Sequence, residues 1–192
     1  MSWEMIRIRA FIGIDFGNDC KAYIHGLQQS LRKYAVRGRW KHSDNFHLTL
    51  KFLDEIDEKQ QKLIEKMLGD ICMSREPFGL EVSELGSFRG RDSIRVLWLG
   101  LTGDLKPLQS LAGDIEKALA PFGFPVEKRP YVPHITIGQD IVFEHSFEQV
   151  RDSVGHIGFG PMKIEKLTLF KSEQLQNKRV YTKISEFGFE NQ

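Results

Sequence analysis

The chain has 192 residues, of which 41% are apolar and 28% charged, and its 27 Lys and Arg against 26 Asp and Glu give a formal net charge of +1. This is enough apolar material for one domain with a proper core, or for two small lobes. No apolar stretch approaches the roughly 20 residues of a membrane-spanning helix, and the N-terminus lacks the apolar core of a signal peptide. We therefore expect a cytoplasmic protein that does not associate with membranes.

Hydrophobic periodicity predicts five elements in the first part of the chain. A strand is expected over residues 6–15, followed by a helix over 18–34 and a strand over 46–53. Asp57 is a candidate cap for a second helix, which Pro77 ends, and a strand follows over 78–88. In the middle strand the apolar residues alternate with His47, Thr49 and Lys51, as in a half-buried strand.

The same order of elements recurs in the second part of the chain. Strands are expected over 94–101, 131–138, 164–170 and 179–187, with helices over 105–122, capped by Asp104, and over 147–154. The two copies are offset by about 87 residues. We interpret the chain as a single domain over 1–192, with repeat halves at approximately 6–90 and 91–187 that form two similar α+β lobes related by pseudo-twofold symmetry.

Aligning the repeats places His47-Leu48-Thr49-Leu50 on His134-Ile135-Thr136-Ile137. With 6 His in the chain, chance predicts only about 0.16 His-x-Thr tripeptides, so one copy is weak evidence. Two copies at equivalent positions, both on alternating strands, indicate a shared site.

Strand geometry determines what such a pair of motifs can do. Residues i and i+2 share one face of a strand, so each motif presents an imidazole and a hydroxyl to the same side. Near neutral pH one imidazole can act as a general base and the other as a general acid. In-line displacement at phosphorus needs a base beside the attacking oxygen and an acid beside the leaving oxygen, with donors around the remaining oxygens.

Other interpretations of these residues are weaker. A lone histidine on a strand usually has a structural or solvated role, and the duplication is what favours function here. No carboxylate or further histidine accompanies either motif, so neither a metal site nor a cofactor is expected. The cysteines, Cys20 and Cys72, lie on predicted helices away from both motifs and are expected to be packing residues, not nucleophiles.

Five segments of the chain carry a family resemblance. RAFIGID, RW…NFHLTLKFLDEID, SIRVLWLG, RPYVPHITIG and LTLFKSE…VYTKISEF together resemble the RNA 2′,3′-cyclic phosphodiesterase (2′-5′ RNA ligase) family of the two-histidine (2H) phosphoesterase superfamily. The resemblance implies an α+β fold of two pseudo-symmetric lobes, each an antiparallel sheet flanked by helices, with a central cleft. It also implies an enzyme, a metal-independent hydrolase that opens an RNA or nucleotide 2′,3′-cyclic phosphate to a 2′-phosphomonoester.

The resemblance also implies roles for six residues. In family terms His47 is the proton donor to the leaving 3′ oxygen and His134 is the proton acceptor from the attacking water. Thr49 and Thr136 match threonines that bind phosphate oxygens. Arg129 and Tyr131 match a basic and an aromatic contact to substrate. The expected partners are RNA termini or small cyclic nucleotides, and nothing in the sequence calls for an obligate protein partner.

The chain departs from the family pattern at two positions. Gln139 follows the second motif where a basic residue is common, and Asp54 follows the first motif where glycine is common. Two other functions stay open. One is 2′-5′ RNA ligation, or hydrolysis of a different cyclic phosphate, because the same imidazoles serve both. The other is a module that binds RNA or nucleotides without turnover, although such a module has no need of two histidines.

The net charge of +1 hides two basic stretches. Residues 31–51 carry six basic residues against one acid, and residues 161–183 carry six against two. The first stretch leads into the first motif, and Lys51 at its end shares the face of His47, where it adds positive potential or is simply solvated. A locally basic cleft on a neutral protein suits a short phosphorylated end better than a long duplex.

Overall fold

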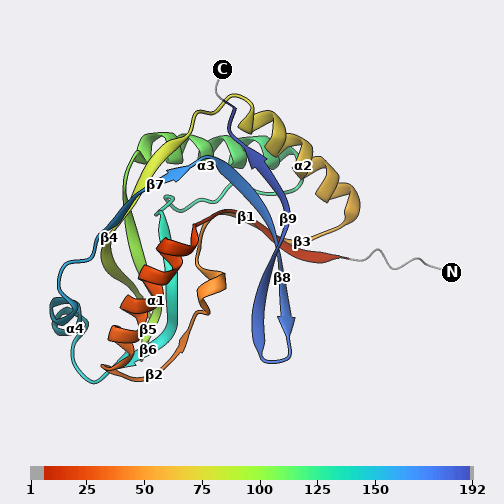
Figure 1. Cartoon of the computed structure of the whole chain (residues 1–192). Coiled ribbons are helices and arrows are strands. Elements are labelled where there is room, and N and C mark those ends of the chain that lie inside the picture. The colour runs from red at the N-terminus through yellow and green to blue at the C-terminus, as the bar shows by residue number, and fades with distance from the viewer. Residues whose placement is uncertain (1–6, 191–192) are drawn as a thin grey trace.

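The computed structural model describes residues 7–190 and contains helices packed against an antiparallel sheet (Figure 1). In chain order the elements are β1 (Ile8–Asp15), α1 (Asn18–Arg32), β2 (Ala35–Trp40), the 3-10 helix η1 (Ser43–Asn45), β3 (His47–Ile56), α2 (Glu58–Cys72), β4 (Phe78–Arg89), β5 (Ile94–Gly103), α3 (Leu105–Leu119), the 3-10 helix η2 (Ala120–Phe122), β6 (His134–Phe143), α4 (Phe147–Val154), β7 (Phe159–Ile164), β8 (Lys166–Leu175) and β9 (Lys178–Gly188).

The strands run in the order β7-β4-β5-β6-β3-β1-β8-β9, and β2 pairs with β6. We call β3, β1, β8 and β9 the β1 half-sheet, and β2, β4, β5, β6 and β7 the β5 half-sheet. Leu48 of β3 faces Ile135 of β6 in the antiparallel register that joins them. Each half-sheet takes strands from both parts of the sequence, because β4 pairs with β5 while β8 pairs with β1.

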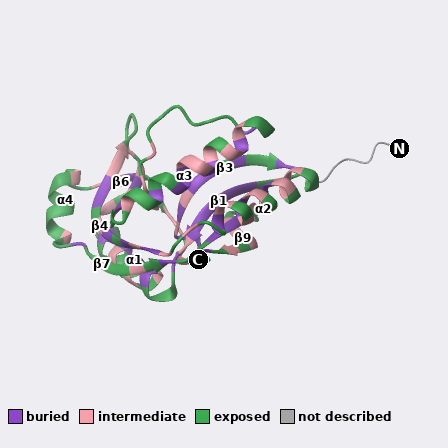
Figure 2. Cartoon of the chain, turned by 90° about the horizontal axis from the view of Figure 1, so that it is seen from above, coloured by how far each residue is buried: buried purple, intermediate pink, exposed green. Residues whose placement is uncertain are grey.

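The helices cover the half-sheets in pairs. Helices α2 and α3 pack together against the β1 half-sheet, whereas α1 and α4 lie against the β5 half-sheet (Figure 1). Buried positions follow the strands and the helix faces turned toward them (Figure 2). The core includes Leu48 and Ile135 themselves, which are 1% and 0% exposed. The apolar residues of both motifs therefore lie in the core, and the intervening histidines and threonines project from the other face of the sheet.

The α+β architecture and the antiparallel sheet are as the sequence predicted, but strands β2 and β7 were missed. Strand β2 pairs only with β6 and is mostly exposed, so it lacks an alternating apolar pattern. Strand β7 pairs with β4 and contains Pro161, a residue tolerated at sheet edges. Ile6, with which the first strand was expected to begin, lies outside the described residues.

Two predicted helix caps had different outcomes. The Asp57 carboxylate accepts a hydrogen bond from the Gln60 backbone amide, and the Gln60 side-chain oxygen accepts one from the Asp57 backbone amide. The two bonds form a capping box on α2. Asp104 makes no side-chain cap on α3. Its carboxylate accepts instead from the Gly79 amide at 2.8 Å, so it fixes the start of β4.

Gln28 is a polar side chain of α1 that is only 1% exposed. Its Nε2 donates to the carbonyl of Lys41 at 2.8 Å and to that of Ile137 at 2.9 Å. The Lys41 amide also donates to the Ile137 carbonyl, at 3.1 Å. One side-chain amide thus connects α1 with the peptide leading into the first motif and with the last residue of the second.

We expect Gln28→Leu to lower the free energy of unfolding by about 1–3 kcal/mol, the usual cost of a buried polar group left without a partner. The substitution removes the side-chain donor to the Lys41 carbonyl. Urea unfolding measures the change, with Gln29→Leu as the control because Gln29 is exposed on the same helix. Equal effects of the two substitutions would contradict the role of the buried amide.

Candidate active site

The first motif lies at the start of β3, where burial alternates along the strand. Leu48 and Leu50 are buried in the core, while His47 and Thr49 are half-buried on the opposite face. The register through Leu48 and Ile135 sets His47 opposite Thr136 and Thr49 opposite His134. The pairing therefore brings the two motifs side by side on neighbouring strands.

The hydrogen bonds of His47 fix its tautomer. Nδ1 lies 2.8 Å from the carbonyl oxygen of Asn45, and Nε2 lies 3.0 Å from the Thr49 hydroxyl. A carbonyl only accepts, so Nδ1 carries a proton. In the neutral ring Nε2 is then an acceptor and receives the Thr49 hydroxyl proton. Nε2 is the nitrogen available for proton transfer.

His134 is held in the same way in the second motif. Its Nδ1 lies 2.7 Å from the carbonyl oxygen of Val132, two residues earlier, as Asn45 is to His47. Nδ1 again carries the proton, which leaves Nε2 for chemistry. Both motifs thus orient an imidazole by the carbonyl at position i−2, a local contact that the alternating sequence pattern does not reveal.

Aromatic rings surround the two histidines differently. The ring centroid of His47 lies 4.6 Å from that of Phe11, 5.0 Å from Tyr181 and 5.9 Å from Phe170. His134 has Phe88 at 5.3 Å, edge to face, and Trp98 at 6.1 Å.

Burial among these rings lowers the pKa of His47 to about 4. The Asn45 hydrogen bond and the negative charge of Asp15 oppose this shift, and the positive charges of Lys41 and Lys21 add to it. At neutral pH the imidazole is neutral in the free protein.

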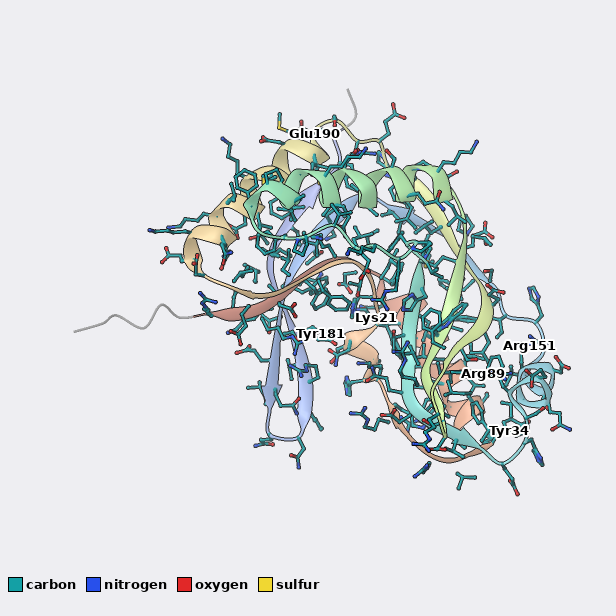
Figure 3. All side chains as sticks on the ribbon, turned by 180° about the vertical axis from the view of Figure 1, so that it is seen from behind. Lys21, Tyr34, Arg89, Arg151, Tyr181 and Glu190 are labelled. Carbon is teal, nitrogen blue, oxygen red and sulfur yellow. The ribbon has the colours of Figure 1, made fainter. Side chains whose placement is uncertain are left out.

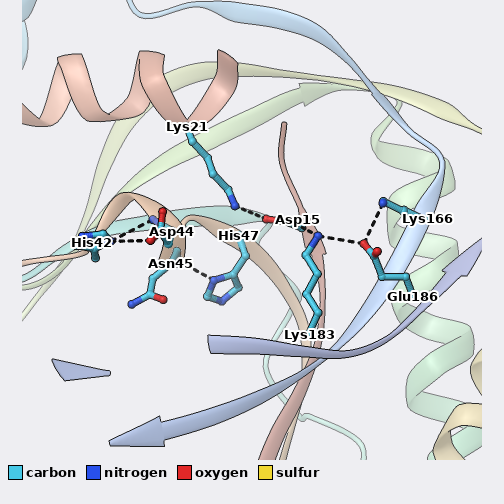
Figure 4. Close-up of polar contacts among 9 residues, drawn as sticks. All are labelled: Asp15, Lys21, His42, Asp44, Asn45, His47, Lys166, Lys183 and Glu186. Atoms are coloured by element: carbon cyan, nitrogen blue, oxygen red, sulfur yellow. Dashed lines mark hydrogen bonds and ion pairs between the residues drawn. The ribbon is translucent and has the colours of Figure 1, made fainter. Parts of the chain in front are cut away.

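A compact ion network lies beside His47 (Figure 4). Asp15 of β1 is the strand partner of His47, and its carboxylate pairs with Lys21 at 2.6 Å and with Lys183 at 2.7 Å. Burial raises the pKa of Asp15, but the hydrogen bonds from Lys183 and Lys21 outweigh it and hold the pKa below its ordinary value. Lys21 comes from α1 and Lys183 from β9, so Asp15 links both half-sheets. Figure 3 shows Lys21 and Tyr181 close to this junction.

Lys51 does not share the face of His47, contrary to the sequence prediction. The register of β1 and β3 shifts between Ile12 and Gly13, and the bulge turns Lys51 toward the helices. A Cβ at position 13 would collide with the Leu48 carbonyl, so glycine permits this close approach. The Lys51 ammonium is buried and donates to Glu116 at 2.6 Å and to the Pro125 carbonyl at 2.9 Å.

The segment over residues 123–133 leads into the second motif and carries Arg129 and Tyr131. The Tyr131 hydroxyl donates to the Thr49 carbonyl at 3.1 Å and so bridges the two motifs. Arg129 is exposed, and its guanidinium forms a two-point contact with the Glu127 carboxylate at 3.2 and 3.0 Å. The structure therefore brings Tyr131 to the motifs, whereas the Arg129 side chain pairs with Glu127.

Other candidate sites offer less chemistry. Burial raises the pKa of the Cys20 and Cys72 thiols to about 12, so neither is a thiolate near neutral pH. Within residues 7–190 no three His, Cys, Asp or Glu side chains gather as metal ligands would. A surface hollow of about 470 Å³ between α2 and α3 is lined by the paired Arg75 and Asp114, but by neither motif. Among residues 7–190 no helix is long and apolar enough to cross a membrane.

Sequence reasoning missed Asp15, Lys21, Asn45 and Tyr181 around His47. Lys21 and Asp15 lie in an expected helix and strand, and only the fold brings them to the site. Asn45 is two residues before His47, but nothing in its spacing shows that its carbonyl holds the ring. Tyr181 lies in the segment VYTKISEF, which contributes to the family resemblance but was not predicted to hold a site residue.

A family model and several curated proteins match this chain. A model of the family described as LigT-like phosphoesterase matches the chain twice, over residues 14–98 and 99–181. An RNA 2′,3′-cyclic phosphodiesterase of Methanothermobacter thermautotrophicus is 25% identical over 185 residues, covering 95% of this chain and 99% of that protein. One from Bacillus subtilis is 33% identical over 150 residues, covering 78% and 79%.

Solved structures show the same fold. The crystal structure of Escherichia coli LigT complexed with 3′-AMP is 25% identical and superposes with a TM-score of 0.80, covering 97% of this chain and 100% of that one. The same protein in its apo form gives a TM-score of 0.78 over 95% of this chain and 97% of that one.

The low pKa of His47 makes stability depend on pH. The unfolded chain takes up a proton near pH 6.5 and the folded chain near pH 4, so stability is complete above about 6.5 and is lost as the pH falls toward 4. His47→Asn keeps a donor for the Asn45 carbonyl but cannot titrate. Between pH 7 and pH 5 we expect the variant to lose about 1–2 kcal/mol less stability than the wild type.

Urea unfolding at the two pH values measures this difference. His145→Asn is the matched control, because His145 is exposed and outside both motifs. It should lose as much stability as the wild type. An identical loss for His47→Asn would show that burial of this ring does not favour its neutral form.

Proposed function

The chain belongs to the LigT-like phosphoesterase family, and we propose that it hydrolyses a 2′,3′-cyclic phosphate, at an RNA 3′ end or on a small nucleotide, to a 2′-phosphomonoester. The proposal includes general acid and base catalysis by His47 and His134 without a metal ion. The observation that carries it is the matched pair of imidazoles, each held at Nδ1 by the carbonyl at position i−2. The names of the relatives supply the substrate class.

The proposed reaction is a single in-line displacement. Nε2 of His134 takes a proton from water as the water oxygen bonds to phosphorus. The bond between phosphorus and the 3′ oxygen breaks on the opposite side, and Nε2 of His47 gives that oxygen a proton. The products are a 2′-phosphomonoester and a free 3′ hydroxyl, and a proton exchange with solvent restores both rings.

The threonines are proposed to hold the other phosphate oxygens. Charge accumulates on these oxygens in the transition state, and hydroxyl donors already in place stabilise it. In the free protein the Thr49 hydroxyl donates to Nε2 of His47. When substrate enters, this hydroxyl can turn to a phosphate oxygen, which frees Nε2 for the leaving oxygen. Thr136 occupies the corresponding position in the second motif.

In this mechanism His47 has to be protonated when the substrate is bound. This ring is neutral in the free protein, because burial lowers its pKa to about 4. A phosphate anion within hydrogen-bond distance favours the charged imidazolium and raises the pKa. In this proposal the acid is charged as the substrate binds, so proton uptake and binding are coupled.

The two residues ahead of the second motif have different proposed roles. Tyr131 fixes the separation of the motifs through its hydroxyl and can offer the rest of its ring to a base. Arg129 can bind phosphate only if its guanidinium leaves the Glu127 carboxylate. This ion pair is exposed and contributes little free energy. We therefore place Arg129 at the margin of the site.

Replacing either catalytic histidine tests the proposal. His47→Ala and His134→Ala should each reduce kcat on adenosine 2′,3′-cyclic phosphate by about 10²–10⁴-fold, the usual contribution of one proton transfer. Chromatography identifies the product, which should be the 2′-phosphate in the wild type, and EDTA should not change the rate. His145→Ala is the control for loss of an exposed histidine. Wild-type turnover by either motif variant would contradict the mechanism.

A further inference from the structure

We propose that Lys41 and Arg179 form a second phosphate-binding site, which takes the phosphate joining the last two nucleotides of an RNA 3′ end. This inference rests on the proposed function and narrows its substrate to RNA ends in preference to cyclic mononucleotides. It follows from the position of these two residues. Lys41 begins the segment over residues 41–46 that leads into His47, and the Arg179 backbone contacts this segment.

Lys41 has a fixed backbone close to both motifs. It directly follows β2 and precedes η1, six residues ahead of His47. Its amide donates to the Ile137 carbonyl at 3.1 Å, and its own carbonyl accepts the Gln28 amide at 2.8 Å. The side chain therefore starts from a rigid point, and its charge reaches His47, whose pKa it helps to lower.

Arg179 approaches the same loop from the other half-sheet. It lies on β9, in the hairpin of β8 and β9 that extends away from the helices (Figure 1). The buried side chain of Asn45 donates to the Arg179 carbonyl at 2.7 Å. The Asn45 carbonyl in turn accepts Nδ1 of His47. One residue, Asn45, thus connects the Arg179 strand directly to the first catalytic imidazole.

The positive charge at this place is not neutralised. Within residues 7–190 no carboxylate forms an ion pair with Lys41 or Arg179, and the Arg179 side chain reaches only the Ser172 hydroxyl, at 3.5 Å. Three acids on the adjoining elements already have cationic partners: Asp15 pairs with Lys21 and Lys183, Asp140 with Arg39 and Glu173 with Lys171. Asp44 is exposed to solvent and lies 3.3 Å from His42.

Burial of Lys41 supports the need for an anion. The residue is half-buried, and burial lowers its pKa, with a further contribution from the positive charges of Arg39 and Arg179. A half-buried ammonium that also experiences the charge of a guanidinium gains stability when an anion binds nearby. A phosphate supplies that charge, and Arg179 can hold two of its oxygens at once.

The position of the site identifies which phosphate it takes. The two motifs hold the cyclic phosphate, and Lys41 and Arg179 lie to the side of His47, where η1 meets β9. RNA has one phosphate for every nucleotide, so the next charge along the chain is the linkage to the preceding nucleotide. Basic side chains following a single strand in this way are usual in proteins that bind RNA ends.

The test compares two substrates that differ by this linkage. Cytidine 2′,3′-cyclic phosphate carries the cyclic phosphate only, and the dinucleotide ApC ending in the same group adds one internal phosphate. The wild type should show a higher kcat/KM on the dinucleotide. Lys41→Gln and Arg179→Gln should each lower kcat/KM about tenfold more on the dinucleotide than on the mononucleotide, the usual scale for a charge-assisted hydrogen bond.

Salt gives an independent measure of the same contact. The plot of log kcat/KM against log salt concentration for the dinucleotide should become shallower when either basic residue is removed, because salt screens the attraction between charges. Lys33→Gln removes the same charge from an exposed position at the end of α1 and is the matched control. Lys41→Arg keeps the charge and should retain most of the dinucleotide preference.

A neutral linkage tests the proposal without any substitution in the protein. The dinucleotide with a methylphosphonate in place of the internal phosphate should be turned over by the wild type no better than the mononucleotide. Equal losses on both substrates in Lys41→Gln, or full turnover of the methylphosphonate, would overturn the second site and leave the proposed function intact. Failure of the wild type to hydrolyse any of the three substrates would instead overturn the proposed function.

Discussion

The backbone pairing of Leu48 with Ile135 is the contact on which the site depends. It joins two half-sheets, and both side chains are in the core. Because neighbouring strand residues alternate between faces, burying these two residues turns the histidine and threonine of each motif to the opposite face. A shift of one residue would bury the imidazoles and expose the core, so the hydrophobic effect sets the register that brings the two motifs together.

Burial and nearby positive charge keep the His47 imidazole, the proposed general acid, in its neutral form in the free protein. The aromatic neighbours exclude water, and the lysines nearby add positive potential, so the free ring sheds its proton. The same surroundings attract an anion, and an anion reverses the balance by stabilising the imidazolium. Asp15 is already paired with Lys21 and Lys183 and therefore leaves the remaining positive charge for the substrate. A neutral protein can in this way present a basic site.

The sequence predicted the parts of the structure that depend on local patterns. Alternation identified β3 and β6, and the repeat of His47-x-Thr49 at His134-x-Thr136 identified two motifs that the structure brings onto neighbouring strands. It failed where a distant contact decides the outcome. Strand β2 exists because β6 offers it a partner, and Lys51 points inward because a bulge opposite Gly13 changes its face. Asn45 gave no signal, since its role depends on a backbone carbonyl.

The two imidazoles share a local geometry but differ in their surroundings, and this difference is the basis for the different roles proposed for them. His47 is enclosed by Phe11, Phe170 and Tyr181 and donates to a carbonyl in the loop that Arg179 also contacts. His134 follows a segment held to the first motif by the Tyr131 hydroxyl. The protonation state of an enclosed ring changes when a charge is placed beside it. A general acid that acts on a bound phosphate needs this change. Pseudo-symmetry therefore supplies two equivalent nitrogens, and the unequal side chains around them are consistent with the acid role proposed for His47.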